Sequence, residues 1–189
     1  CNNPPSWVTP TFDDPIDMDS YPPDLCWHGA GLAVRGQRMM ALLGASTSHT
    51  MPGLEAISMD NHLLSAEWYV PALIAAEAAY GDDPGISDPA ALDRAIAILD
   101  GWDYKATADS TAASLYTLWA EAVSSAGVDV LSPPPATVPR DLAVAALNAL
   151  ARAALALEAA HGTAAVPYGN VHRIRRGSVD LPAGGSEGF

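Results

Sequence analysis

The chain has 189 residues, 49% of them hydrophobic and 16% charged, and its formal net charge is -13 at pH 7. This length and composition predict one folded domain with a core and exclude a disordered acidic chain. The negative charge disfavours nucleic acid and anionic membrane surfaces as partners. The basic residues near the C-terminal end, in 172–176, are too few to reverse that field.

The cysteine content excludes a disulfide-rich scaffold. The chain has two cysteines, Cys1 and Cys26, so a single disulfide between them is the most that they can form. Cys26 also belongs to a Cys-Trp-His triplet that ends at His28, but no second pair of metal ligands accompanies it. A half-buried cysteine and a surface histidine are therefore favoured over a metal site.

Residues 1–31 are predicted to form an extended, proline-rich arm. Six prolines lie within residues 1–23, and they prevent both a helix and a long strand there. The arm also carries apolar side chains that are costly to expose to water, namely Trp7, Val8, Phe12 and Ile16. We therefore expect the arm to pack against a neighbouring structure.

Residues 32–161 are predicted to form a mainly α domain of about six helices. Apolar residues at steps of three and four predict helices over 32–43, 54–64, 65–80, 88–99, from 109 or 110 to 127, and 140–161. Asp88 followed by Pro89 is a strong helix start. Pro71 lies inside the third helix, so a kink or a break is expected near Val70.

The stretch 99–119 is expected to organise these helices. One helix closes, the chain turns on Gly101, and the next helix opens, so the two helices should meet around Trp102 and Trp119. Asp100 and Asp103 flank Trp102 on this turn. Helix capping and solvation are favoured for both carboxylates over an acid–base role.

The helix 140–161 carries a stripe of small alanines that allows close contact with other helices. The alternative to packing within the domain is that this helix binds a partner. Its polar residues Asn148, Arg152 and Glu158 are expected to face water. No transmembrane span is predicted, because the run 142–160 is mostly alanine and carries two of these charged residues.

Residues 162–189 are predicted to form an arm rich in glycine and arginine, with one short strand around 171–175. This arm is too small to fold alone. The sequence contains no Walker loop and no H-E-x-x-H motif. No complete set of catalytic residues is therefore visible from motifs alone.

Three separated segments nevertheless match one family pattern in order and spacing. Residues 1–5 are similar to an N-x-N-x-x-P segment, and the third segment, Tyr168 to Arg173 running into Asp180 to Gly185, is similar to W-G-x-x-H-R followed by L-P-x-G-G, with tyrosine in place of tryptophan. The second segment comprises 35–38, 42–43, 59–60, 70–71 and 99–119. Together they resemble the β-subunit of the penicillin acylase family, which includes acyl-homoserine lactone and aculeacin-type acylases.

The resemblance implies a specific activity. In this family the N-terminal Ser, Cys or Thr of the β-subunit is the nucleophile, freed by self-cleavage, and its own α-amino group is the base. The chain would then be the helical β-subunit portion of an acylase that hydrolyses linear amides, such as β-lactam, acyl-homoserine lactone or lipopeptide side chains. The implied partners are the rest of the α- and β-subunits and a small acyl-amide substrate, and the parent enzyme would be periplasmic or extracellular. Taken as an internal fragment, the chain is expected to be inactive.

The resemblance also implies roles for individual residues. Asn2 would be the side-chain donor of the oxyanion hole, and Arg35 would belong to the charge network near the nucleophile. Asp13 falls where some members place a calcium ligand, although a solvated carboxylate is favoured. No cofactor is expected for the chain itself, and calcium stays open for the parent enzyme. His172 is expected to be a structural hydrogen-bonding residue rather than a base.

Two readings from other classes remain open, and both depend on Cys1. As a lipidated cysteine it would anchor a helical binding module of a secreted lipoprotein. As a nucleophile it would belong to a different N-terminal hydrolase, but that fold needs a β-sheet scaffold for which the chain has too few strand signals.

Overall fold

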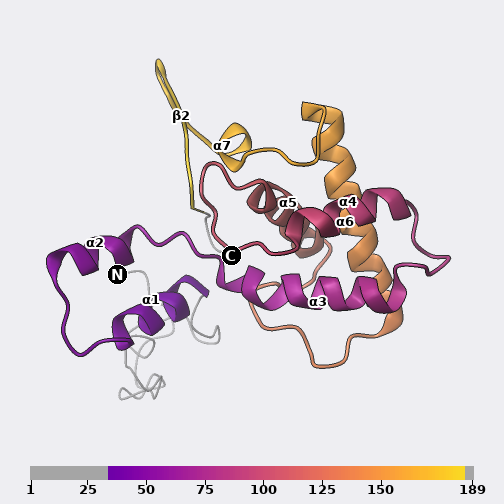
Figure 1. Ribbon diagram of the computed structural model, residues 1–189, viewed down its shortest axis with the longest axis horizontal. Coiled ribbons are helices and arrows are strands. Elements are labelled where there is room, and N and C mark those ends of the chain that lie inside the picture. The colour runs from indigo at the N-terminus through magenta and orange to yellow at the C-terminus, as the bar shows by residue number, and fades with distance from the viewer. Residues whose placement is uncertain (1–33, 186–189) are drawn as a thin grey trace, which may run out of the picture. The chain divides into compact units, whose positions relative to one another are not determined.

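The computed structural model describes residues 34–185, and this part of the chain is mainly α. It contains seven helices and two short antiparallel strands, which confirms the fold class predicted from the sequence. The described residues fall into two compact units that divide between Asp60 and Asn61. The first unit holds α1 and α2, and the second holds all later elements (Figure 1).

The first unit is a pair of short helices, α1 (Val34–Gly44) and α2 (Met51–Ser58). The Thr50 hydroxyl accepts a hydrogen bond from the backbone N–H of Gly53 at 3.2 Å and so caps α2. The sequence prediction of 54–64 was wrong for this helix, which begins and ends earlier. The chain beyond it is extended because the Asn61 carbonyl and the Leu63 N–H pair with residues of the loop that follows α4.

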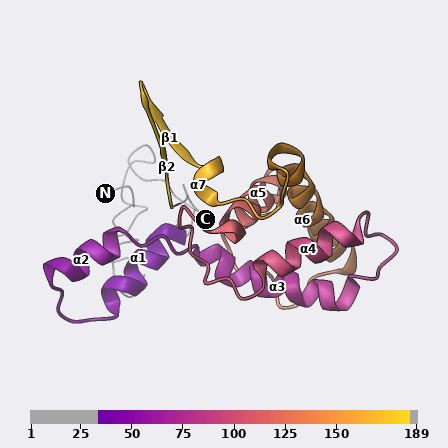
Figure 2. The same ribbon diagram turned by 45° about the horizontal axis from the view of Figure 1, so that its top comes forward.

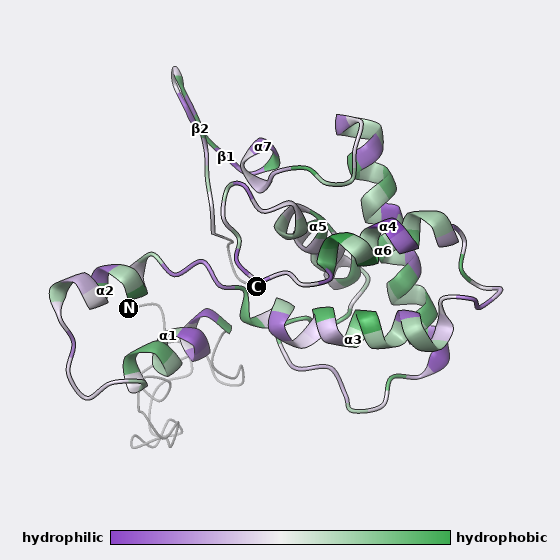
Figure 3. Ribbon diagram, viewed as in Figure 1, coloured by the Kyte–Doolittle hydropathy of each residue, from purple (hydrophilic) through white to green (hydrophobic). Residues whose placement is uncertain are grey.

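The second unit is built on four long helices, α3 (Leu64–Tyr80), α4 (Pro89–Leu99), α5 (Thr111–Ser125) and α6 (Arg140–His161). The helix α6 packs against each of the other three helices, and both ribbon views show it beside them (Figure 1, Figure 2). Apolar residues run along α3, α5 and α6 (Figure 3). The largest fully buried side chains of this core include Val70, Leu92, Leu99, Leu115, Tyr116, Trp119, Leu147 and Leu150.

Local caps set the ends of three of these helices where the sequence predicts them. The Asp88 carboxylate accepts from the Ala91 N–H at 2.8 Å, and the Ser110 hydroxyl accepts from the Ala113 N–H at 3.2 Å. Gly162 ends α6 in the left-handed region, with φ of 79°. These contacts are short-range, so the sequence alone identifies them.

The helix α3 runs without a break through Pro71, so the predicted break near Val70 was wrong; the alternative, a kink, stays a prediction. A proline inside a helix costs roughly 3 kcal/mol through a lost hydrogen bond and a steric clash. Val70 and Leu73 are both almost fully buried in the core, and burying two such side chains offsets a cost of this size.

By length and composition alone, α6 could cross a membrane, and half of its apolar window is buried inside the structure. The Trp119 indole N–H donates to the Ala146 carbonyl of this helix at 3.1 Å. Two of the polar side chains expected in water instead join α6 to its surroundings: Asn148 binds the Gly85 carbonyl and the Ser87 N–H, and Glu158 pairs with Arg94 of α4. In this structure α6 is the central helix of a packed core.

The C-terminal part of the second unit consists of a one-turn helix, α7 (Tyr168–Val171), and the hairpin of β1 (Arg173–Arg176) and β2 (Val179–Pro182). The predicted short strand corresponds to β1. Arg176 pairs with Val179, so the loop has two residues. Its first residue, Gly177, has φ of 58°, a value that glycine tolerates in tight hairpin turns.

Candidate functional site

The residues with the strongest predicted roles lie outside the part of the chain that the structure describes. Asn2 and Asp13 fall in residues 1–33, as do Cys1, Cys26 and His28. The oxyanion-hole role of Asn2 and the calcium role of Asp13 therefore stay predictions, as does a disulfide between the two cysteines.

Arg35 lies in the first turn of α1 and is exposed to solvent. Its predicted place in a charge network stays a prediction. Its neighbour Arg38 forms a two-point ion pair with Asp60, with 2.7 Å from Nε to Oδ2 and 3.2 Å from Nη2 to Oδ1. This pair joins two of the matching segments, 35–38 and 59–60, across the first unit.

Trp102, on the turn after α4, belongs to a cluster of aromatic rings. The ring of Tyr116 lies between Trp102 and Trp119, with centroid distances of 5.7 and 5.5 Å. Tyr69 of α3 extends the cluster from Trp119 at 5.6 Å. The prediction that α4 and α5 meet around the two tryptophans is confirmed, and the cluster also reaches α3.

The phenol of Tyr116 is the most deeply buried titratable group that the structure describes in this cluster. Its hydroxyl donates to the Ser65 hydroxyl at 2.8 Å, and both side chains are buried. Burial raises the pKa of Tyr116 well above its usual value, more than the Ser65 hydrogen bond lowers it. The phenol is therefore neutral across the physiological range and serves packing and hydrogen bonding.

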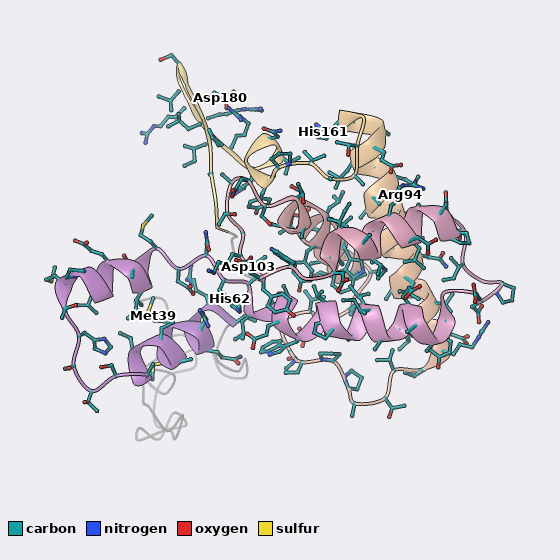
Figure 4. All side chains as sticks on the ribbon, viewed as in Figure 1. Met39, His62, Arg94, Asp103, His161 and Asp180 are labelled. Carbon is teal, nitrogen blue, oxygen red and sulfur yellow. The ribbon has the colours of Figure 1, made fainter. Side chains whose placement is uncertain are left out.

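The two carboxylates on the turn after α4 are exposed, as predicted. Asp103 accepts a hydrogen bond from the backbone N–H of Lys105 at 3.1 Å and stabilises the turn (Figure 4). Asp100 is exposed at the C-terminal end of α4. Tyr104 beside them has φ of 60°, which is uncommon for a residue with a side chain. These contacts agree with capping and solvation rather than acid–base chemistry.

The third matching segment docks onto the loop before α5 through close backbone contacts. The Gly169 N–H donates to the Ala108 carbonyl at 2.7 Å, and the Gly185 N–H donates to the Ala106 carbonyl at 2.8 Å. A Cβ atom at Gly169 would lie 2.5 Å from Cβ of Pro182, and one at Gly184 would lie 2.8 Å from the Ala106 carbonyl. The glycines of the motif are therefore required for this docking.

Two side chains of the same segment lock the hairpin to α7. The His172 ring stacks on Tyr168 with a centroid distance of 4.9 Å, and Nδ1 lies 3.3 Å from the Ala183 carbonyl. This agrees with the predicted hydrogen-bonding role. Arg173 donates from Nη1 to the Gly169 carbonyl at 2.9 Å and from Nε to Asp180 at 2.6 Å. The guanidinium lowers the pKa of Asp180, chiefly through this hydrogen bond.

A hollow of about 210 Å³ lies between α5 and α7 and reaches Leu157 of α6. Two of its hydroxyls are already engaged, because Ser114 donates to the Val166 carbonyl at 2.7 Å and Thr117 donates to the Ala113 carbonyl at 2.7 Å. The lining residues are Ser114, Thr117, Leu118, Glu121, Leu157, Tyr168, Val171 and His172. The engaged hydroxyls shape the wall of this hollow and are not poised as nucleophiles.

The described residues hold no metal-binding group, and most of their histidine rings make structural hydrogen bonds. Within residues 34–185, no cluster of three or more His, Cys, Asp or Glu side chains could hold a metal ion. Three of the four histidine rings in this part form hydrogen bonds: His49 and His172 with backbone carbonyls, and His62 with a carboxylate.

Sequence reasoning missed the loop 106–108 as a docking surface. These three small residues lie between two helices, and no sequence pattern identifies them as a contact surface. The glycines that dock on them lie much further along the chain. The repeated glycines at 169 and 184–185 were the one available signal, because glycine often marks a close approach of two backbones.

A comparison with protein families extends the resemblance that the sequence motifs indicate. A family described as penicillin amidase matches residues 1–189. No curated protein matches the chain. Because the match covers all 189 residues, the chain belongs to the penicillin amidase family.

Proposed function

We propose that this chain is the helical β-subunit portion of a self-processing acylase that hydrolyses linear amides. The family match over residues 1–189 carries this proposal. The packed helical core of the second unit supports it, because such a core can hold extended arms and a docked hairpin in fixed positions around a catalytic centre.

In the proposed reaction, an N-terminal Ser, Cys or Thr attacks the amide carbonyl while its own α-amino group takes the proton. The carbonyl oxygen becomes an oxyanion, and the Asn2 side-chain N–H donates to it. The intermediate collapses, the amine leaves with the proton, and water then hydrolyses the acyl-enzyme. Arg35 holds the charges around the nucleophile, and calcium is a structural candidate in the parent enzyme through Asp13.

The substrate classes that we propose are the acyl amides of β-lactams, homoserine lactones and lipopeptides. We further propose that the parent enzyme acts in the periplasm or outside the cell and that the remaining α- and β-subunit segments are its partners. The 189-residue chain by itself is expected to be inactive, and the Ser114, Tyr116 and Thr117 hydroxyls are consistent with this because each is engaged in a structural hydrogen bond.

The test is expression of the whole reading frame that contains this chain. The purified protein should cleave itself ahead of a Ser, Cys or Thr, which N-terminal sequencing of the products detects. It should also release free amine from at least one of phenylacetyl, hexanoyl and dodecanoyl amides. The 189-residue chain, assayed on the same panel, should show no turnover.

Two outcomes would contradict the proposal. One is turnover by the 189-residue chain that disappears in Cys1→Ala, which would make Cys1 the nucleophile of a different enzyme. The other is a reading frame whose product is neither self-cleaved nor active on any amide, together with a lipid-modified Cys1, which would favour the anchored binding module.

A further inference from the structure

The hairpin of β1 and β2 projects from the helices of the second unit in both ribbon views (Figure 1, Figure 2). Side chains alternate between the two faces of a strand, so the register assigns each residue to a face. One face is mostly apolar and carries Ile174, Arg176, Val179 and Leu181. The opposite face is polar and carries Arg173, Arg175, Asp180 and Pro182.

No element within residues 34–185 covers the apolar face. Ile174 is 58% exposed, Leu181 is 56% exposed and Val179 is 45% exposed. Ile174 and Leu181 are directly opposite each other in the register, so they form one exposed cross-strand pair. A two-stranded hairpin is marginally stable alone and gains from a further strand. The exposed pair therefore marks a surface that further structure can cover.

The two edges of the hairpin differ in their free backbone groups. The Ala183 N–H donates to the His172 carbonyl at 3.0 Å, which makes this a hydrogen-bonded pair. Hydrogen-bonded pairs alternate along an antiparallel ladder. The N–H and C=O groups of Arg173 and Arg175 therefore point outward from the β1 edge, and those of Asp180 point outward from the β2 edge.

The β2 edge is closed to a further strand. Pro182 has no backbone N–H, and the Asp180 carbonyl already accepts from Arg173 Nη2 at 3.2 Å. On the β1 edge, both outward residues have a backbone N–H, and no carbonyl within the described part of the chain is recorded as accepting from either. An added strand must therefore pair with β1.

The charges of the hairpin select the partner. Arg173 and Arg175 share one carboxylate oxygen of Asp180, at 2.6 and 3.4 Å, and Arg176 lies near the turn. The hairpin thus has an excess of positive charge on a chain whose net charge is -13. Pairing β1 with β1 of a second copy would place arginines side by side, which is unfavourable. An acidic strand would instead meet these arginines with opposite charge.

We propose that the outer edge of β1 binds an extended segment of another polypeptide that alternates apolar and acidic side chains. Its apolar residues continue the face of Ile174 and Leu181, and its carboxylates lie beside Arg175 on the polar face. The backbone N–H and C=O groups of Arg173 and Arg175 form the ladder. This inference follows from the hairpin alone and does not depend on the proposed reaction.

The first test measures binding of two synthetic peptides, TVEVEVT and TVKVKVT, to the 189-residue chain by fluorescence anisotropy. The acidic peptide should bind at least tenfold more tightly than the basic one, and its affinity should fall as salt rises. On binding, the backbone amides of Arg173 and Arg175 should exchange with deuterium more slowly, while that of Asp180 should not change. This readout uses the natural chain and needs no variant to fold.

The second test compares Arg175→Ala with Arg175→Pro, two variants that lose the same charge. Only the proline variant also loses the outward N–H, so it should bind the acidic peptide about tenfold more weakly than the alanine variant does. Circular dichroism establishes that both variants keep their helices.

Four results would overturn the proposal. They are equal binding of the two peptides, equal affinity of the two Arg175 variants, protection of Asp180 in place of Arg175, and absence of binding to either peptide. A chain that forms dimers through β1 would also contradict it, because a second copy would then occupy this edge. Binding of anionic phosphatidylserine vesicles that is equal for Arg175→Pro and Arg175→Ala would contradict it as well, because it would not require the open backbone edge.

Discussion

The helical core of the second unit, which includes Val166 and Tyr168, and the C-terminal segment 169–185 are held by different kinds of contact. The core buries aromatic and aliphatic side chains, with Tyr116 and Trp119 at its centre. The C-terminal segment instead docks through backbone hydrogen bonds at Gly169 and Gly185 and through the guanidinium of Arg173. Apolar periodicity therefore predicts the first region, and only the folded chain reveals the second.

The largest loss of stability should come from the aromatic centre of the core. Trp119→Ala removes a side chain that is 1% exposed, together with its hydrogen bond to the Ala146 carbonyl. We expect a loss of about 3–5 kcal/mol in the free energy of unfolding, measured by urea denaturation. The matched control is Leu142→Ala on the exposed side of α6, which should stay within about 0.5 kcal/mol. Equal losses for the two variants would show that the cluster is not the centre of the core.

A smaller loss of stability should follow when an added methyl group blocks the close backbone contact of the C-terminal segment. In Gly169→Ala, the new Cβ atom would lie 2.5 Å from Cβ of Pro182 and 3.1 Å from the Ala108 carbonyl. We expect a cost of about 1–3 kcal/mol, with faster amide exchange in 168–185 and unchanged exchange in α6. Gly44→Ala is the control, because nothing lies within 4 Å of the added atom. An unaltered exchange pattern in Gly169→Ala would contradict the docking described above.

The buried phenol gives a test that depends on pH. Tyr116→Phe leaves the Ser65 hydroxyl without its donor and should cost about 1–2 kcal/mol at pH 7. Because burial raises the pKa of Tyr116 in the folded state, the unfolded chain releases this proton first, and stability should fall as pH rises above the unfolded value of 10.0. Urea denaturation at pH 7 and pH 10.5 should show a smaller fall for the variant than for the natural chain.

The smallest effect should come from the exposed ion pairs of the hairpin. Arg173 lowers the pKa of Asp180, so this carboxylate stabilises the hairpin above its unfolded pKa of 3.8, and the contribution is lost as pH falls through its lower folded value. The protection factors of the β1 amides, which divide out the intrinsic pH dependence of exchange, should therefore fall below pH 4 in the natural chain and change less with pH in Asp180→Asn. The same fall in both proteins would assign the effect to another group.

Most of the fold could be predicted because its signals are local. The caps at Asp88 and Ser110 and the left-handed Gly162 lie within a few residues of the ends that they set. The predicted bounds of α2 were wrong because Asn61 and Leu63 pair with the loop after α4, about forty residues away. A pairing over that distance leaves no trace in the periodicity of either segment.

The candidate site was less accessible to sequence reasoning than the fold. The hydrogen-bonding role of His172 could be predicted from the motif, whereas the clamp of Arg173 across Asp180 and Gly169 depends on a hairpin turn. The roles of Asn2 and Arg35 rest on resemblance, since a side chain that stabilises an oxyanion has no pattern of its own in sequence.

The most direct test of the proposed function is the value of kcat for Asn2→Ala in the self-processed enzyme, measured on the best amide of the panel. Loss of one oxyanion donor should lower kcat by about 100- to 1,000-fold. Arg152→Ala, which removes an exposed arginine from α6, should leave kcat within twofold of the natural enzyme. A kcat for Asn2→Ala equal to that of the natural, correctly self-cleaved enzyme would contradict the assignment of Asn2 to the oxyanion hole.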